Sequence, residues 1–360
     1  MTGSRLVERI WWDRGALAAA ARAALSPAAL LYRGAVAARG ALLDSGWLSA
    51  TTVPLPAIGV GNLTVGGTGK TPVTAWIAAE LVARGAHPAV VLRGYGGDEP
   101  EVHRRLNPAV PVIVSADRAI GIARAAGGGA DIALLDDAFQ QRRLGGIAHI
   151  ALLSADRRDS GRLLPAGPWR EPLVALRRAS LVLVTRKAAS ANDVSATMAE
   201  ARSAAPAVPV AVAHLAIGDL LRLGSSERRD HRSLGGARVL AIAAIGDPDA
   251  FMRQLREFGA EVDAAPFPDH HRFVANAELS QLVARSIAAD ITVCTLKDAV
   301  KLAPLWPRQA PPLWYVSQRV VLEDGTAEMT AVLDAALRSR RVDPNPSGAT
   351  PDSPPRHHPR

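Results

Sequence analysis

The chain has 360 residues, 48% of them hydrophobic and 21% charged, so it is long enough for two domains and can bury a core. Its single cysteine, Cys294, excludes an internal disulfide framework and a cysteine-rich zinc module. The net charge of +8 favours an anionic partner, which phosphates, nucleic acid or an acidic membrane surface would each satisfy.

The N-terminal segment, residues 1–48, is basic and rich in Ala and Leu, with tryptophans near the edges of its apolar runs. Its longest uncharged run, 23–32, contains Pro27 and is too short to span a bilayer, which takes about 20 apolar residues. Arg22 interrupts the apolar region that a signal peptide needs. Two interpretations remain open: a pair of amphipathic helices in a membrane interface, or a helical hairpin packed on the body.

The body of the chain alternates between strand-length apolar runs and helical patterns, which predicts an α/β fold with a mainly parallel sheet and flanking helices. The first series of expected strands is 55–60, 88–92, 111–115, 131–135, 148–153 and 181–184. The second series is strand 238–244, helix 248–258, a loop through 265–274, helix 276–288, strands 291–294 and 313–316, and helix 326–339.

A polar stretch at 216–236, rich in Gly, Ser and Arg, separates the two series. We therefore expect a core domain over 49–222 and a smaller α/β domain over 223–341. The remaining residues, 342–360, contain six prolines and no aromatic residue, a composition typical of a disordered tail.

Residues 60–72 read VGNLTVGGTGKTP and lie between an expected strand and an expected helix, which is the context of a phosphate-binding P-loop. Gly66, Gly67 and Gly69 allow the backbone to curl so that successive N–H groups point at phosphate oxygens. The N-terminus of the following helix adds a positive end. This segment predicts a nucleotide-phosphate site.

Two side chains complete the expected P-loop. Lys70 would reach the β- and γ-phosphates, and the Thr71 hydroxyl would bind Mg²⁺. The pattern G-x-x-x-x-G-K-[ST] is met except at its first glycine, which is Thr64 here. A glycine-rich turn that binds no phosphate is the alternative.

A second motif, DIALLDD at 131–137, is a buried-strand pattern that ends in Asp136 and Asp137. It is typical of a Walker B strand, whose acid binds Mg²⁺ directly or through water. Two adjacent acids also suit a site where a cation offsets their mutual repulsion.

Seven blocks in a fixed order give the chain a resemblance to the tetraacyldisaccharide 4′-kinase family over about residues 5–340. The blocks are VGNLTVGGTGKTP (60–72), RGYG (93–96), GDEP (97–100), DDAFQ (136–140), LPAGPWRE (164–171), DHH (269–271) and TLKDAVK (295–301). Thr64 is usual in the loop of that family. The chain departs from the family in Ala138, Gln141 and Leu296, and in lacking a spacer between the second and third blocks, so its acceptor pocket can differ.

The resemblance implies a P-loop NTPase-type kinase that uses ATP and Mg²⁺ to phosphorylate the 4′-hydroxyl of a tetraacyldisaccharide 1-phosphate in lipid A biosynthesis. It implies Asp98 as the acid that activates this hydroxyl, His270 as its partner, and Lys70 as the third catalytic residue. An oriented carboxylate–imidazole pair suits removal of a hydroxyl proton. Without the resemblance, His270 reads as a loop histidine stacked on Phe267 or Phe273.

The resemblance also assigns the binding residues. ATP-binding residues are Thr64, Val65, Gly66, Gly67, Thr68, Gly69, Lys70 and Thr71. Metal-binding residues are Thr71, Glu99, Asp136 and Asp137. Substrate-binding residues are Asn62, Arg93, Tyr95, Arg118, Arg170 and Glu171, in which the guanidinium groups match phosphate oxygens. Lys297 and Lys301 lie one helical turn apart and fit either an active-site role or a solvated helix face.

A lipid with several acyl chains leaves a bilayer only at ~0.8 kcal/mol per exposed CH₂, so the enzyme must come to the membrane. Under the resemblance, we expect peripheral binding of residues 1–48 to the cytoplasmic face of the inner membrane. The expected partners are the lipid A disaccharide precursor and an anionic membrane surface. No obligate protein partner is expected, and nucleic acid is not expected because aromatic residues are only 4% and no recognition motif is present.

The main alternative is a membrane-associated P-loop ATPase or GTPase switch without a lipid acceptor. A partitioning-type ATPase carries a lysine before Gly-Gly-x-Gly-Lys, where this chain has Val65. Guanine recognition uses Asn-Lys-x-Asp, but TLKD at 295–298 places its lysine one residue late and TRKA at 185–188 lacks the acid. A switch would hydrolyse nucleotide alone, whereas a kinase would turn over only with its acceptor.

Overall fold

The computed structural model describes residues 3–13, 15–47, 49–94, 97–157 and 161–340, so the expected tail at 342–360 lies outside the described residues. The strands are β1 Ala57–Asn62, β2 Pro88–Leu92, β3 Val112–Val114, β4 Ile132–Asp136, β5 Ile147–Ser154, β6 Leu181–Arg186, β7 Val210–Arg222, β8 Arg228–Arg229, β9 Arg238–Ala243, β10 Glu261–Pro266, β11 Ile291–Thr295 and β12 Leu313–Asp324. The helices are α1 Gly3–Trp12, α2 Ala16–Asp44, α3 Lys70–Ala83, α4 Glu99–Leu106, α5 Arg118–Gly127, α6 Ala191–Ala204, α7 Pro248–Glu257, α8 Ala277–Ala288, α9 Leu296–Leu302 and α10 Thr326–Ser339, with 3₁₀ turns η1 Leu173–Arg178 and η2 His231–Leu234.

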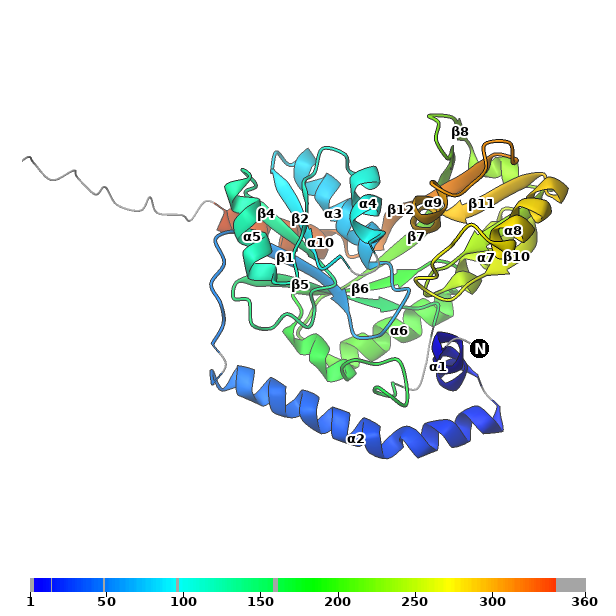
Figure 1. Ribbon diagram of the computed structural model, residues 1–360. Coiled ribbons are helices and arrows are strands. Elements are labelled where there is room, and N and C mark those ends of the chain that lie inside the picture. Colours follow the sequence, from blue (N-terminus) through cyan, green and yellow to red (C-terminus); the bar gives the residue numbers. More distant parts are fainter. Residues whose placement is uncertain (1–2, 14, 48, 95–96, 158–160, 341–360) are drawn as a thin grey trace, which may run out of the picture.

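These strands form one 12-stranded sheet in the order β10-β9-β11-β12-β7-β6-β5-β1-β4-β2-β3, with β8 beside β7 (Figure 1). Apart from the two-residue strand β8, which is antiparallel to β7, the neighbours within each half of the sheet are parallel, and the two halves meet at the antiparallel pair β7 and β12. The predicted α/β class with a mainly parallel sheet is confirmed.

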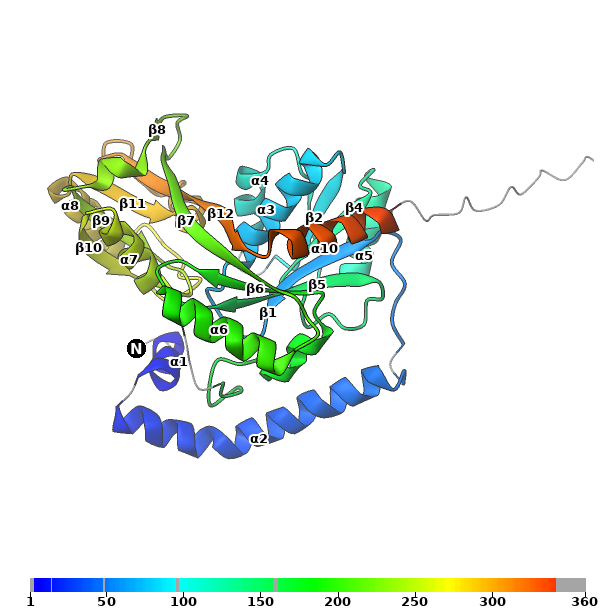
Figure 2. The same cartoon turned by 180° about the vertical axis from the view of Figure 1, so that it is seen from behind.

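Strand β4 shows why the first half is covered on both faces. Ile132 and Leu134 join the core formed with α3 and α10, whereas Ala133 and Leu135 join the core formed with α5. Side chains alternate between the faces of a strand, and a strand buried on both faces reads as a continuous apolar run. Figures 1 and 2 show helices on both sides of this half of the sheet.

The last helix, α10, packs against the first half, although it lies within the range expected for the second domain. Met329 and Leu333 share a core with Ile58 of β1, and Asp334 pairs with Arg84 at 2.6 Å. The chain therefore crosses to the second half after β7 and returns along β12, as Figure 2 shows.

Strands β7 and β12 differ from expectation because each pairs with a partner that is distant in sequence. β7 runs through 216–222, part of the stretch expected to be a boundary, and β12 extends to Asp324 instead of ending at 316. Each satisfies the backbone groups of the other, with Arg222 opposite Trp314 and Val212 opposite Asp324. β10 was not expected; it is an edge strand with a weak apolar pattern that pairs with β9.

The N-terminal helices lie apart from the sheet. α2 passes beneath the body and presents exposed leucines, among them Leu17 at 88% and Leu31 at 77% exposure (Figure 1). Contacts to the body include the Tyr32 hydroxyl, which donates to the Arg170 carbonyl at 3.1 Å, and an ion pair between Asp44 and Arg142. Among the described helices none is long and apolar enough alone to cross a membrane; α1 and α2 pass that test only as a pair bent by 95°.

We predict that Gly61→Ala destabilises the protein by about 1–3 kcal/mol through overpacking. A Cβ at Gly61 would lie 2.5 Å from the backbone nitrogen of Phe139, which cannot rotate away. The matched control is Gly127→Ala in α5, where a Cβ has no neighbour within 4 Å and alanine favours the helix. Urea unfolding measures both; equal effects of the two substitutions would contradict the prediction.

Candidate active site

The predicted P-loop joins β1 to α3 at the carboxyl end of the sheet. Gly69 has a φ of 89° and directly precedes α3, and a Cβ there would lie 2.2 Å from Leu215 Cδ1. Gly66 has a φ of 92°. These left-handed conformations favour glycine and let the backbone curl ahead of the positive end of α3.

Asn62 at the end of β1 holds the loop together from inside. It is fully buried, its Nδ2 donates to Thr68 Oγ1 at 2.9 Å, and its Oδ1 accepts from Lys70 Nζ at 3.2 Å. The resemblance assigned Asn62 to the substrate, but both ends of its side-chain amide act on the loop. Its direct effect in this structure is to place the Lys70 ammonium.

The two acids that end β4 face this loop, as the Walker B interpretation predicts. Thr71 Oγ1 donates to Asp136 Oδ2 at 3.1 Å, and Lys70 Nζ lies 3.5 Å from Asp137 Oδ1. Asp137 has a φ of 53°, a strained backbone for a residue other than glycine. Arg170 donates to both Asp137 oxygens, at 3.1 and 3.2 Å.

The residues around Asp136 fit a Mg²⁺ ion. Asp136 Oδ1 is buried and has no hydrogen-bond partner among the described residues, although the residue is only 4% exposed. Burial acts to raise the pKa of Asp136, but the hydrogen bond from His103 and the charge of Lys70 outweigh it, so the pKa lies below its ordinary value. A hydroxyl and an ionised carboxylate are hard oxygen donors of the kind that Mg²⁺ prefers.

Asp98 and His270 are 172 residues apart in sequence but lie side by side at the start of α4. The distance between Asp98 Oδ1 and His270 Nδ1 is 4.0 Å, and Lys297 Nζ of α9 lies 3.9 Å from Asp98 Oδ2. Asp98 is 3% exposed and neither carboxylate oxygen has a hydrogen-bond partner among the described residues. His270 has a φ of 58°, so the loop holds it in a strained conformation beside the acid.

The alternative interpretation of the histidine loop applies to His271, not to His270. His271 stacks on Phe267 with ring centroids 4.8 Å apart and packs edge-on against Phe273. His271 Nε2 also lies 2.8 Å from Glu278 Oε1. These contacts anchor the loop and leave His270 facing Asp98.

Glu99 connects the two groups of charges. Burial, together with the charge of Asp136, raises the pKa of Glu99 to about 7, and the charges of Lys297 and Lys70 act in the opposite direction. The charges of Asp136, Asp98 and both lysines all act on Glu99. Glu99 therefore lies between the P-loop and the Asp98–His270 pair. A cation bound there would favour its ionised form.

The expected substrate residues fall into separate groups. Arg118 is 4% exposed and donates to the Ser115 and Asp136 carbonyls, each at 3.0 Å, so it supports β4 from inside. Glu171 is buried and accepts from Arg178 at 2.7 Å. Arg93 is exposed after β2 and near enough for its charge to act on Arg118. Tyr95 lies outside the described residues.

Sequence reasoning missed the residues that support the loop on the β6 side. Lys187 Nζ donates to the Gly67 carbonyl at 2.8 Å and Thr185 Oγ1 to the Thr68 carbonyl at 2.9 Å. Lys187 is 6% exposed, and burial lowers its pKa below the ordinary value. Two signals were available: it is one of four lysines in the chain, and it follows a parallel strand at the edge where sites form.

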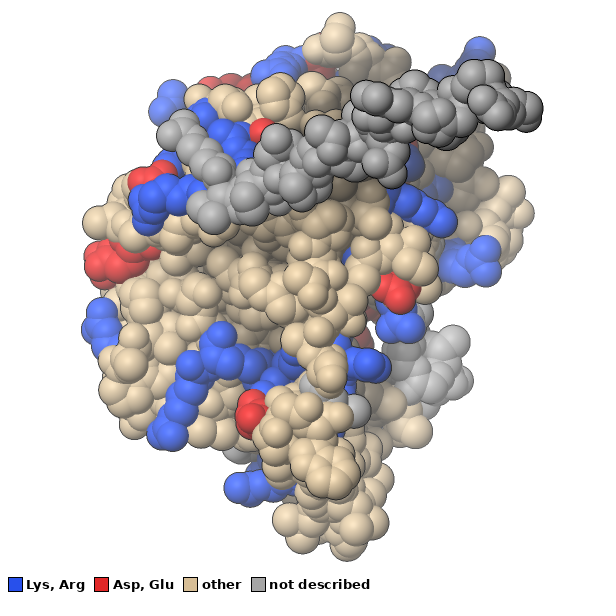
Figure 3. Space-filling view, turned by 90° about the vertical axis from the view of Figure 1, so that its left-hand side faces the viewer, with Lys and Arg blue, Asp and Glu red and all other residues tan. Residues whose placement is uncertain are grey.

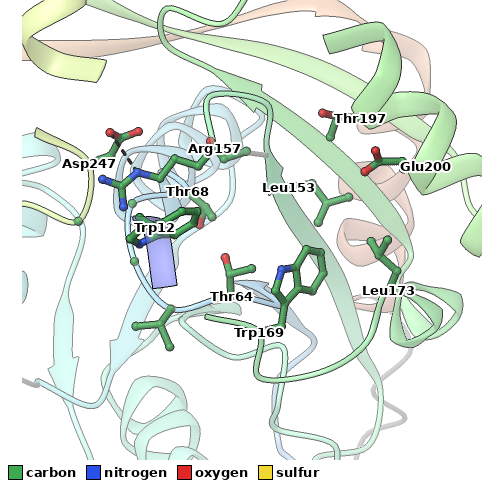
Figure 4. A pocket seen from close by; sticks show the side chains of 15 residues that line it. Trp12, Thr64, Thr68, Leu153, Arg157, Trp169, Leu173, Thr197, Glu200 and Asp247 are labelled. Atoms are coloured by element: carbon green, nitrogen blue, oxygen red, sulfur yellow. Dashed lines mark ion pairs between the residues drawn. The ribbon is translucent and has the colours of Figure 1, made fainter. Parts of the chain in front are cut away.

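A further contact links the loop to the N-terminal segment. Arg157 Cζ lies 4.8 Å from the centroid of the Trp12 ring, and Arg157 Nε lies 3.3 Å from Asp247 Oδ1 (Figure 4). Asp247 in turn packs against Gly67 of the loop. A pocket on this side is lined by Trp12, Thr64, Thr68, Leu153, Arg157, Trp169, Thr197, Glu200 and Asp247, among others. The loop is therefore enclosed by α1, α6 and the second half of the chain.

A glycine loop, two facing acids and a separate carboxylate–imidazole pair define a P-loop phosphotransferase. The family model described as tetraacyldisaccharide-1-P 4′-kinase matches residues 21–108 and 96–338. The chain belongs to this family, and the resemblance found in the sequence is confirmed.

Relatives and a solved structure agree. Tetraacyldisaccharide 4′-kinases from Anaeromyxobacter sp. (strain Fw109-5) and Halorhodospira halophila are 39% and 37% identical, over 92% and 87% of this chain and 96% and 92% of theirs. The crystal structure of LpxK from Aquifex aeolicus in complex with ATP is 27% identical, with a TM-score of 0.66 over 88% of this chain and 99% of that one.

We predict that Glu99→Gln stabilises the metal-free protein more at pH 8 than at pH 5. The pKa of Glu99 is about 7 in the folded state and 4.5 ordinarily, so the folded state binds more protons between these two values. The free energy of unfolding of the wild type therefore falls as the pH rises from 4.5 to about 7. With allowance for partial exposure, we expect a gain of about 1–2 kcal/mol at pH 8 by urea unfolding. Glu261→Gln on the exposed face of β10 is the control; a pH-independent gain at Glu99 would refute the prediction.

Proposed function

We propose that this chain transfers the γ-phosphate of ATP to the 4′-hydroxyl of a tetraacyldisaccharide 1-phosphate, with Mg²⁺, in lipid A biosynthesis. The family and its relatives support the reaction. The observation that carries it is the pairing of Asp98, at the start of α4, with His270, 4.0 Å away in the loop after β10. A nucleotide switch is not favoured, because it has no use for a second carboxylate–imidazole pair that activates an acceptor.

The P-loop residues would hold the ATP phosphates. Backbone N–H groups of the glycine loop and of the start of α3 would bind the phosphate oxygens, apart from those of Val65 and Thr68, which donate to the Pro168 and Gly66 carbonyls. Lys70, placed by Asn62, would neutralise the β- and γ-phosphates. Thr71 and Asp136 would hold Mg²⁺, with Glu99 and Asp137 adjacent. When bound, Mg²⁺ supplies neutralisation of the charge on the transferred and leaving oxygens.

Asp98 would act as the base. As the bond between the 4′-oxygen and the γ-phosphorus forms and the bond to the β-phosphate oxygen breaks, the hydroxyl proton passes to Asp98, and ADP is the leaving group. His270 and Lys297 flank the buried carboxylate from two sides, at 4.0 and 3.9 Å. Little proton affinity is needed, because phosphoryl transfer depends chiefly on positioning and charge.

The arginines divide by position. We assign Arg170, which donates to Asp137, and Arg93, on the exposed rim, to the phosphates of ATP or of the lipid. Arg118 and Glu171 shape the site from inside. We also retain the division into a core of 49–222 and a second domain from 223, with α10 packed on the core.

We further propose that residues 1–48 bind the cytoplasmic face of the inner membrane. The exposed leucines of α2 are unlike a soluble surface, and Arg33 and Arg39 on the same helix are exposed. In Figure 3, basic side chains gather above the lower, mainly uncharged part of the molecule where α2 lies. Apolar side chains with flanking arginines suit an anionic interface.

We predict that Asp98→Asn lowers kcat by about 10²–10⁴-fold and leaves the Kd of ATP nearly unchanged, because the substitution removes a base that does not contact the P-loop. Steady-state transfer of labelled phosphate to the purified lipid and calorimetric ATP binding measure the two quantities. Asp263→Asn on the exposed β10 is the control. Wild-type turnover by Asp98→Asn would reject the assignment.

A combined Leu17→Gln, Leu30→Gln and Leu31→Gln variant should bind anionic phosphatidylglycerol vesicles at least tenfold more weakly. Each leucine contributes roughly 1.5 kcal/mol or more when buried, and a tenfold loss corresponds to about 1.4 kcal/mol. Ile287→Gln on α8, 71% exposed and outside the N-terminal segment, is the matched control. Vesicle flotation is the measurement, and unchanged binding of the triple variant would refute the anchoring proposal.

A further inference from the structure

His103 is a buried polar residue that has no part in the proposed phosphate transfer. It lies on α4 one turn after Glu99, so both side chains project from the same face of the helix. The residue is 1% exposed, and its Nε2 is 2.8 Å from Asp136 Oδ2. A histidine buried against the acid of the Walker B strand has a defined effect on that acid.

The direction of this hydrogen bond follows from the acceptor. A carboxylate that binds a cation is ionised, so it has no proton to donate and can only accept. His103 Nε2 therefore carries the proton and donates it to Oδ2. The Thr71 hydroxyl donates to the same oxygen at 3.1 Å.

Three contacts together fix Asp136. Its Oδ2 is held by His103 and Thr71, and its backbone carbonyl is held by Arg118 at 3.0 Å. Its Oδ1, buried and without a hydrogen-bond partner among the described residues, is left as the free acceptor. A carboxylate that is held by one oxygen presents the other in a fixed direction.

We propose that His103 is a positioning residue for the metal–nucleotide site: by donating to Asp136 Oδ2, it directs Oδ1 to the cation held with Thr71. The inference rests on the proposed nucleotide site and goes beyond it, because His103 touches neither nucleotide nor metal. Partners that orient metal ligands in this way typically change metal affinity 10–100-fold when removed.

The same contact anchors α4. This helix packs on α3, where Asn107 Nδ2 donates to the Ala75 carbonyl at 2.7 Å, and it begins beside Asp98 and Glu99. His103 thus joins the helix that bears the proposed base to the strand that bears the metal ligand. This buried hydrogen bond is a direct link between these two groups.

The test compares ATP binding with and without the cation. Calorimetry gives the Kd of ATP in EDTA and in Mg²⁺, and electron paramagnetic resonance of Mn²⁺ reports cation binding to the ATP complex directly. We expect His103→Leu, which keeps the volume but removes the donor, to weaken binding of Mg²⁺–ATP and of Mn²⁺ by 10–100-fold, with the metal-free Kd changed less than twofold.

Two polar variants keep the test decisive if His103→Leu fails to fold. Glutamine can place an amide nitrogen near the position of Nε2, whereas asparagine is too short to reach Asp136. His103→Gln should therefore restore most of the Mg²⁺ effect and His103→Asn should not. His149→Leu, the same change at another buried histidine on β5, should leave both Kd values within twofold of the wild type.

Either of two results would overturn the proposal: Mg²⁺–ATP affinity that is unchanged in His103→Leu and His103→Asn, or an equal loss with and without the cation, which indicates a structural role alone. These measurements contain no lipid. If the chain failed to phosphorylate the lipid but the effect of His103 on cation binding were found, the proposed function would be overturned and the role of His103 would stand. If the chain phosphorylated the lipid but His103→Leu had no effect on cation binding, only the role of His103 would be overturned.

Discussion

The active site depends on the gathering of four carboxylates, Asp98, Glu99, Asp136 and Asp137, at one edge of the sheet. Burial raises the pKa of Glu99 to about 7, and repulsion from the like charges of Asp136 and Asp98 adds to that effect. Lysine ammonium groups from both halves of the molecule lie beside these carboxylates: Lys70 of α3 beside Asp137, and Lys297 of α9 beside Asp98. Arg170 adds a third positive charge at Asp137, and a bound divalent cation would add positive charge at Asp136, whose Oδ1 has no hydrogen-bond partner among the described residues.

The second half of the chain supplies charged groups to the active site and does not only cover it. Lys297 and His270 reach Asp98 from beyond the antiparallel pair of β7 and β12, and Asp247 approaches the P-loop at Gly67. Any relative movement of the halves would change the distances of His270 and Lys297 from Asp98. Orientation of reacting groups can supply much of the rate of a phosphoryl transfer, so this junction is where control of the geometry lies.

The parts of the site that follow from local sequence could be predicted from it. A glycine loop between a strand and a helix fixes its own geometry, and Asp136 faces Thr71 because adjacent parallel strands end at one edge. The pairing of Asp98 with His270 spans 172 residues, and only the family resemblance indicated it. His103 gave no pattern, because its partner is supplied by tertiary packing, and Lys187 was indicated only by the scarcity of lysine and by its position after a parallel strand.

The same limit explains the fold. Strands such as β4 could be recognised as continuous apolar runs because both of their faces are buried. β10 is largely exposed, and the outer part of β12 is half exposed and pairs with the distant strand β7, so neither has a clear apolar pattern. Tertiary hydrogen bonds, not composition, extend them. The long β7–β12 pair that results joins two parallel sheets that would otherwise present open edges, and it thereby brings α9 and the histidine loop to the mouth of the P-loop.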